Sequence, residues 1–304
     1  MLSSLSKMFA KLISVNNLRA YAWASLVSQI LIVVTGGLVR LTGSGLGCPT
    51  WPKCTADSLT TVPAQGYHGL IEFGNRLLTF ALLVVAVLTI LAVFNRAVDR
   101  SLGLRSPAVI LFAGIPAQVI LGGFTVLTKL NPWLVGAHFI LSAIMIVTAT
   151  VLVWRVYAPS PAFVPARAYA IAPSVSIFGA ISVVIGVLVT GAGPHAGDAN
   201  SIRNGLDLET WFHYHSYPAY VLLALIVVEL LYLIRADRNE DGQLVLSLPT
   251  KIALGLLAGT IIQAIIGVIQ ARLGVPAGLV AVHMLGASSL VSLIAFNHLA
   301  ARAK

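Results

Sequence analysis

Histidines recur at matching places in the two halves of the chain, inside long apolar runs. In the first half, His68 opens one run and His138 lies six residues into another. In the second half, His213 and His215 open a run and His283 lies seven residues into the last one. Two imidazoles on facing helices of a four-helix bundle are a common way to hold haem iron. The pattern therefore predicts one haem site in each half.

Other metals fit this pattern less well. Zinc and copper sites use three or four close ligands, often including carboxylate or thiolate. Here the paired histidines stand alone within apolar sequence. Small residues beside them leave room for a flat macrocycle, namely Gly136, Ala137, Gly286 and Ala287.

Polar groups share one helical face beside His68, in the stretch GYHGLIEFGNRLLTF. His68, Glu72 and Asn75 are spaced i, i+4 and i+7, and Arg76 adjoins them. A buried carboxylate is costly unless it is paired or protonated, so Glu72 either pairs structurally with Arg76 or is catalytic. The matching stretch ETWFHYHSYPAYVLL has no carboxylate after its first residue. These differences favour a reaction site in the first half and a resident electron-transfer haem in the second.

The only two cysteines, Cys48 and Cys54, lie in one loop with five residues between them. Two thiolates without a nearby histidine make too few ligands for a metal site. Outside the membrane a thiol pair tends to be oxidised. A disulfide is the main prediction, and a pair of free thiols in redox exchange is the alternative.

Two further residues are candidates for contact with a cofactor. His195 lies in the segment TGAGPHAGD, where it lines a site mouth, hydrogen-bonds a propionate or has a plain loop role. Arg40 ends the first apolar run, next to the loop with the cysteines. We include both in the predicted cofactor-binding set, together with Asn75 and Arg76.

The composition predicts an integral membrane protein. Of 304 residues, 58% are hydrophobic and 10% charged, whereas soluble domains carry about 25% charged residues. About 20 apolar residues cross a bilayer as a helix. Eight such runs occur, at roughly 18–39, 68–94, 106–128, 132–154, 168–190, 211–234, 250–270 and 276–300.

The placement of Lys and Arg predicts that both termini are cytoplasmic. Thirteen of the 19 basic residues fall in the terminal segments and the three loops on their side. Topology and anionic lipid explain the positive charge, so we expect the bilayer as a partner and no nucleic acid. The cysteine loop and the paired histidines then lie toward the outer face.

An internal repeat divides the chain near its middle. Gln118 precedes His138 by twenty residues, and Gln263 precedes His283 by the same distance. Because each half holds four spans, the halves share one orientation. We expect two tandem four-helix bundles related by a pseudo-two-fold axis along the membrane normal, residues 1–156 and 157–304.

The motifs VTGGLVRLTGSGLGCPTWPKC, IEFGNR, TGAGPHAGD and AVHMLGA, taken in order, resemble the haem A synthase family, in its actinobacterial form. The resemblance implies that haem O is converted to haem A by successive hydroxylations of a ring methyl to a formyl group. The product serves cytochrome c oxidase. It also implies haem b in the second half, held by His215 and His283, and the substrate haem in the first half near Glu72. The cysteine pair belongs to the family pattern.

The implied partners are haem O, molecular oxygen or water, an unknown electron donor such as quinol, and haem O synthase. The implied location is the plasma membrane.

The chain departs from the family where many members read Glu-x-x-His-Arg, because Asn75 stands at the histidine position. His68 replaces that ligand from the same face, or His138 ligates alone and the sixth position stays open. In the second half His215 is favoured over His213, because it is deeper and aligns with Asn75.

Two other functions were weighed. A di-haem b cytochrome that passes electrons from quinol explains the histidines but not Glu72. A transporter with parallel repeats predicts charge along a path inside the membrane, and the spans hold few charges.

Overall fold

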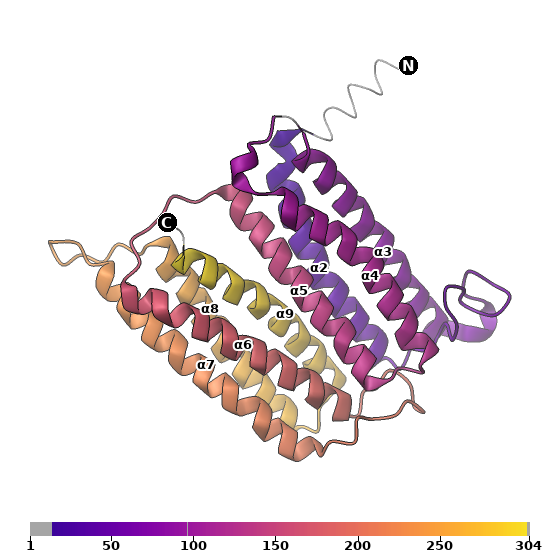
Figure 1. The fold of residues 1–304 in the computed structure, drawn as a ribbon. Helices are drawn as coiled ribbons and strands as arrows, with labels where there is room; N and C mark the ends of the chain where they lie inside the picture. Colours follow the sequence, from indigo (N-terminus) through magenta and orange to yellow (C-terminus); the bar gives the residue numbers. More distant parts are fainter. Residues whose placement is uncertain (1–13, 96, 303–304) are drawn as a thin grey trace. The chain divides into compact units, whose positions relative to one another are not determined.

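The computed structural model describes residues 14–95 and 97–302. Within these ranges, strand pairing is limited to one isolated bridge between Arg238 and Leu244. Eight helices are long and apolar enough to cross a membrane, which confirms the expected all-α membrane protein with eight spans. They are α2 (Leu18–Leu41), α3 (Gly66–Val93), α4 (Arg105–Leu127), α5 (Pro132–Tyr157), α6 (Ala166–Ala192), α7 (Leu208–Ala236), α8 (Leu248–Arg272) and α9 (Ala277–Ala301) (Figure 1).

The helix lengths and start points follow from the local sequence. Helices of 23 to 29 residues extend roughly 35 to 44 Å, which exceeds a hydrocarbon core of about 30 Å. Asn131 accepts the backbone N–H of Trp133 where α5 begins, and Asp207 accepts that of Thr210 where α7 begins. Such caps satisfy N–H groups that a helix start leaves without partners. Lys7, Lys11, Arg96 and Lys304, which enter the predicted charge asymmetry, lie outside the described residues.

The chain divides into two compact units. Unit 1 contains α2 to α5 together with the segment Gly197–Ser201, and unit 2 contains α6 to α9. The Gly197 carbonyl accepts the N–H of Gly45 at 2.8 Å, and the Ser201 hydroxyl donates to the Lys129 carbonyl at 3.3 Å. These bonds hold the short segment against the loops of unit 1.

Within each unit every helix packs mainly against two others. In unit 1, α2 and α4 each pack against α3 and α5; in unit 2, α6 and α8 each pack against α7 and α9 (Figure 1). Helices α3 and α5 therefore lie on one diagonal of unit 1, and α7 and α9 lie on one diagonal of unit 2. The diagonal pairs carry all the histidines expected to bind haem.

Large apolar side chains cover the outward faces of the helices. Phe80 is 66% exposed and Ile262 is 57% exposed, whereas Leu256 and Ile226 are fully buried. Soluble monomers rarely expose large contiguous apolar patches. Lipid is therefore the solvent that these faces fit, and the protein is a multi-pass membrane protein.

Candidate haem and reaction site

Unit 2 brings the rings of His215 of α7 and His283 of α9 close together, edge to face. Their ring centroids lie 6.4 Å apart and the ring planes meet at 70°. His213 is exposed instead, and its Nδ1 lies 2.9 Å from the carbonyl oxygen of Glu209. His215 is therefore the imidazole on α7 that the fold pairs with His283.

The distance between the two rings is compatible with two imidazoles that bind one metal ion. A metal–imidazole bond is about 2 Å long in zinc sites, so one ion between two imidazoles separates the ring centres by about 6 Å. The Nδ1 atoms of His215 and His283 are buried without a hydrogen-bond partner. Buried polar atoms nearly always have partners, so these nitrogens indicate a ligand-binding role. Neutral imidazoles in a helical bundle fit a haem iron.

Glycines on neighbouring helices make room for both rings. A Cβ atom on Gly186 would lie 3.0 Å from Cε1 of His215, and one on Gly267 would lie 3.2 Å from Cε1 of His283. Side chains at these positions would press on the imidazoles. Gly286, which we expected to leave space for a macrocycle, instead packs against the side chain of Gln263.

In unit 1, His138 of α5 has the same kind of surroundings as His283 has in unit 2. A Cβ atom on Gly122 would lie 3.2 Å from Cε1 of His138, whose Nδ1 is also buried without a partner. Gln118 donates to the His138 carbonyl at 3.3 Å, and Gln263 donates to the His283 carbonyl at 2.8 Å. The spacing of twenty residues between glutamine and histidine thus reflects a hydrogen bond between neighbouring helices. The sequence alone did not predict this bond.

Asn75 lies on α3, at the other end of the unit 1 diagonal. A Cβ atom on Gly36 of α2 would lie 3.9 Å from Nδ2 of Asn75. Oδ1 of Asn75 is buried without a hydrogen-bond partner. Asn75 is therefore a polar residue beside a glycine of the preceding helix, as His215 is beside Gly186 in unit 2.

His68 lies near the start of α3 and contacts the loop after α2. Its Nδ1 is hydrogen-bonded to the hydroxyl of Ser44 at 2.9 Å, and its ring lies 4.0 Å from that of Tyr67. His68 is thus partly occupied by a loop contact, and its role as an iron ligand stays a prediction.

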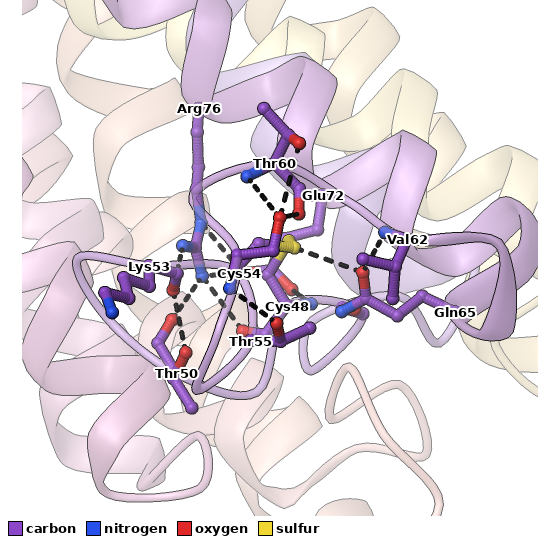
Figure 2. The surroundings of a disulfide bond; sticks show 12 residues. Cys48, Thr50, Lys53, Cys54, Thr55, Thr60, Val62, Gln65, Glu72 and Arg76 are labelled. Atoms are coloured by element: carbon purple, nitrogen blue, oxygen red, sulfur yellow. Dashed lines mark hydrogen bonds and ion pairs between the residues drawn. A yellow bond between two sulfur atoms is a disulfide. The ribbon is translucent and has the colours of Figure 1, made fainter.

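Glu72 is buried, with 5% of its surface exposed, and it points toward the cysteine loop (Figure 2). Its Oε2 accepts the backbone N–H of Cys48, and its Oε1 accepts Nη2 of Arg76 at 2.6 Å and Nε at 3.2 Å. The carboxylate is therefore paired and hydrogen-bonded, as a buried charge requires. Its catalytic role stays a prediction.

Arg76 and the disulfide hold the loop over Glu72. Cys48 and Cys54 form the predicted disulfide. Nη2 of Arg76 donates to the carbonyls of Cys48 at 2.9 Å and Thr50 at 3.1 Å, and Nη1 donates to that of Lys53 at 3.3 Å (Figure 2). The carboxylate, the guanidinium and the loop backbone thus form one connected network.

Arg40 and His195 lie apart from this network. Cγ of Arg40 lies 3.6 Å from where a Cβ atom on Gly197 would be, within unit 1. Nε2 of His195 lies 2.8 Å from the Val275 carbonyl oxygen, within unit 2. His195 therefore joins the loop after α6 to the loop before α9. Contact of either residue with a propionate stays a prediction.

The sequence comparison of the two halves missed a buried carboxylate, Glu229. Its side chain is fully buried in α7, and Oε2 accepts Nδ2 of Asn297 of α9 at 2.9 Å. Glu229 lies beyond the first turns of its span, where the two halves differ in carboxylates. An acidic residue inside an apolar run was the signal that could have found it.

Comparison with known proteins identifies the family. Residues 19–295 match the COX15-CtaA family, described as cytochrome oxidase assembly proteins. The chain is 30% identical over 122 residues to a haem A synthase of Geobacillus thermodenitrificans, covering 40% of the chain and 37% of that protein. It is 31% identical over 186 residues to a haem A synthase of Alkalihalophilus pseudofirmus, covering 58% of each.

A third relative is a protohaem IX farnesyltransferase of Thermus thermophilus. It is 38% identical over 80 residues, which are 26% of the chain and 12% of that protein. These three matches span between 12% and 58% of the relatives' lengths. The family match, by contrast, extends from the first described span into the last, and the chain belongs to the COX15-CtaA family of cytochrome oxidase assembly proteins.

Proposed function

We propose that the protein is a haem A synthase, an enzyme that oxidises a methyl group of haem O to a formyl group by successive hydroxylations. Its product serves cytochrome c oxidase. One observation carries the proposal: unit 2 pairs two imidazoles, whereas unit 1 offers His138 together with Glu72, a carboxylate held by Arg76 and the disulfide loop. The buried carboxylate of unit 2, Glu229, lies fourteen residues beyond His215 on α7 and bonds Asn297 instead. This asymmetry suits one haem that transfers electrons and one that is the substrate.

The residues then have separate roles. His215 and His283 hold a resident haem b, and His138 holds haem O and the product haem A in unit 1. A haem iron supplies the oxidising chemistry and a path for electrons. Glu72, fixed by Arg76 and the N–H of Cys48, presents a carboxylate that stabilises positive charge or holds a proton during oxidation of the methyl group.

The remaining candidates lie at the same end of their units. Arg40 lies in the last turn of α2, and His195 lies in the loop after α6. There they would give the propionates of a bound haem a cationic and a hydrogen-bonding partner. We place these ends toward the outer face of the plasma membrane and both termini in the cytoplasm, because most Lys and Arg residues flank the opposite ends.

The proposed partners follow from the reaction. Haem O is the substrate, molecular oxygen or water supplies the oxygen atom, and a donor such as quinol supplies electrons. Haem O synthase is a further proposed partner, because it would supply the substrate.

Expression with a source of haem O tests the proposal. Extracted haem is analysed by mass, and the wild type should yield hydroxymethyl and formyl haem. Glu72→Ala should lower the yield at least about tenfold, because one charge-stabilising group is worth 2 to 4 kcal/mol in similar sites. Glu209→Gln, an exposed carboxylate of α7, is the matched control and should keep the wild-type yield. Absence of modified haem in the wild type, with haem O bound, would refute the assignment.

A further inference from the structure

We infer that Asn75 occupies in unit 1 the place that His215 occupies in unit 2, so that unit 1 presents a haem with one imidazole and one amide. The inference rests on the proposed function, because it requires haem to bind in unit 1. It deepens that function by giving the reacting site an open coordination position. Its basis is a set of matching contacts in the two units.

His138 of α5 and His283 of α9 have matching surroundings in the two units. His138 and His283 both lie beside a glycine of the preceding helix, at the same distance of 3.2 Å from a Cβ atom placed there. Both have a carbonyl that accepts the amide of a glutamine twenty residues earlier. Both lie six residues after the first residue of their helices. These two imidazoles are therefore structural counterparts.

The other end of the diagonal has the same construction. His215 lies beside Gly186 of the preceding helix, and Asn75 lies beside Gly36 of its own preceding helix. The gap is wider at Asn75, 3.9 Å against 3.0 Å, because an amide side chain is shorter than an imidazole. Nδ1 of His215 and Oδ1 of Asn75 are each buried without a hydrogen-bond partner. The site is thus built in the same way but carries a different donor.

His68 does not fill this place. It lies seven residues before Asn75, about 10 Å along the helix axis at 1.5 Å per residue. The hydrogen bond between its Nδ1 and the Ser44 hydroxyl holds its ring against the loop after α2, away from Asn75. The single iron ligand of unit 1 is therefore His138, and the opposite face is lined by the amide of Asn75.

An amide on that face has a definite chemical consequence. A carboxamide carries two N–H donors and one acceptor, and it is not among the usual axial ligands of haem. Unit 2, with two imidazoles, suits electron transfer, and unit 1 leaves room for a small diatomic ligand. Asn75 is then a positioning residue whose N–H donates a hydrogen bond to that ligand.

Spectroscopy of the purified haem-loaded protein tests the inference, with carbon monoxide as the probe. The wild type should contain one low-spin haem that ignores carbon monoxide and one high-spin haem that binds it. Asn75→His should make the second haem low-spin and abolish carbon monoxide binding. The reciprocal change, His215→Asn, should give unit 2 a high-spin haem that binds the gas.

Further variants separate the possible failures. His68→Ala should leave both spectra unchanged, and Asn75→Leu should shift the carbon monoxide stretching frequency without loss of binding. A low-spin unit 1 haem in the wild type that becomes high-spin in His68→Ala would overturn the inference and leave the proposed function standing. If His138→Ala lost no haem and the wild type held only one, the proposed substrate site itself would fail. An unchanged spectrum of the unit 2 haem shows that a variant in unit 1 is correctly folded. For His215→Asn, the spectrum of the unit 1 haem serves as this check.

Discussion

At the scale of single residues, Arg76 connects the buried carboxylate of Glu72 to the disulfide loop. Its guanidinium bonds Glu72 and three loop carbonyls, so one side chain satisfies a buried charge and fixes a disulfide-closed segment. Arg suits this task better than Lys, because its planar fork donates in several fixed directions. The position of Glu72 therefore depends on the loop as much as on its own helix.

Arg76→Gln should reduce haem A formation about tenfold to a hundredfold. Breaking a fully buried ion pair costs roughly 3 to 5 kcal/mol of folding stability, and we expect a smaller effect here because the Arg76 side chain is 22% exposed. Haem A yield is measured beside the unit 2 haem spectrum, which should not change. Lys53→Ala is the matched control, because only the backbone carbonyl of Lys53 contacts Arg76. An unchanged yield in Arg76→Gln would show that Glu72 needs no such support.

At the scale of elements, glycines set how closely the helices approach the imidazoles. Gly186 and Gly267 face the rings of His215 and His283 across a helix contact, whereas Gly255 of α8 faces open space. A glycine inside a helix costs about 0.5 to 1 kcal/mol relative to alanine. The first two glycines therefore have a packing role that offsets this cost, and Gly255 has none in this structure.

Gly186→Val should weaken haem b binding in unit 2 and disturb its low-spin spectrum. Even the first added carbon lies 3.0 Å from Cε1 of His215, closer than ordinary van der Waals contact. Gly255→Ala should keep the spectrum and raise thermal stability slightly. Haem content by pyridine haemochrome and melting followed by absorbance measure both effects. Equal haem content in the two variants would argue against the glycine's role.

At the scale of the whole molecule, the sequence repeat becomes two units with the same order of packing neighbours. In each unit one diagonal helix pair carries the candidate haem ligands. The disulfide loop, Glu72 and Asn75 belong to unit 1, and the paired imidazoles belong to unit 2. In the proposed function, these side chains give the two units different roles.

Labelling of introduced cysteines tests the proposed orientation. Ala199→Cys, in the exposed loop between α6 and α7, should react with a membrane-impermeant maleimide in intact cells. Asp241→Cys, in the exposed loop between α7 and α8, should react only after lysis. The reverse pattern would place both termini outside. The native cysteines are paired in a disulfide and should not contribute background.

The sequence by itself determined the eight spans, since bilayer thickness demands apolar runs of a definite length, and predicted their limits to within three residues. It also predicted the disulfide, because the two cysteines share one short loop, and a resemblance to the haem A synthase family; the structure and the family match confirm both. Only the tertiary structure decided which imidazole meets His283, and that Asn75 stands beside a glycine as His215 does. Helical spacing gives the face of a residue, but the partner on another helix depends on axial register and helix separation. Those quantities arise from packing across the bundle, and so does the contact that joins Glu72 to a loop distant in sequence.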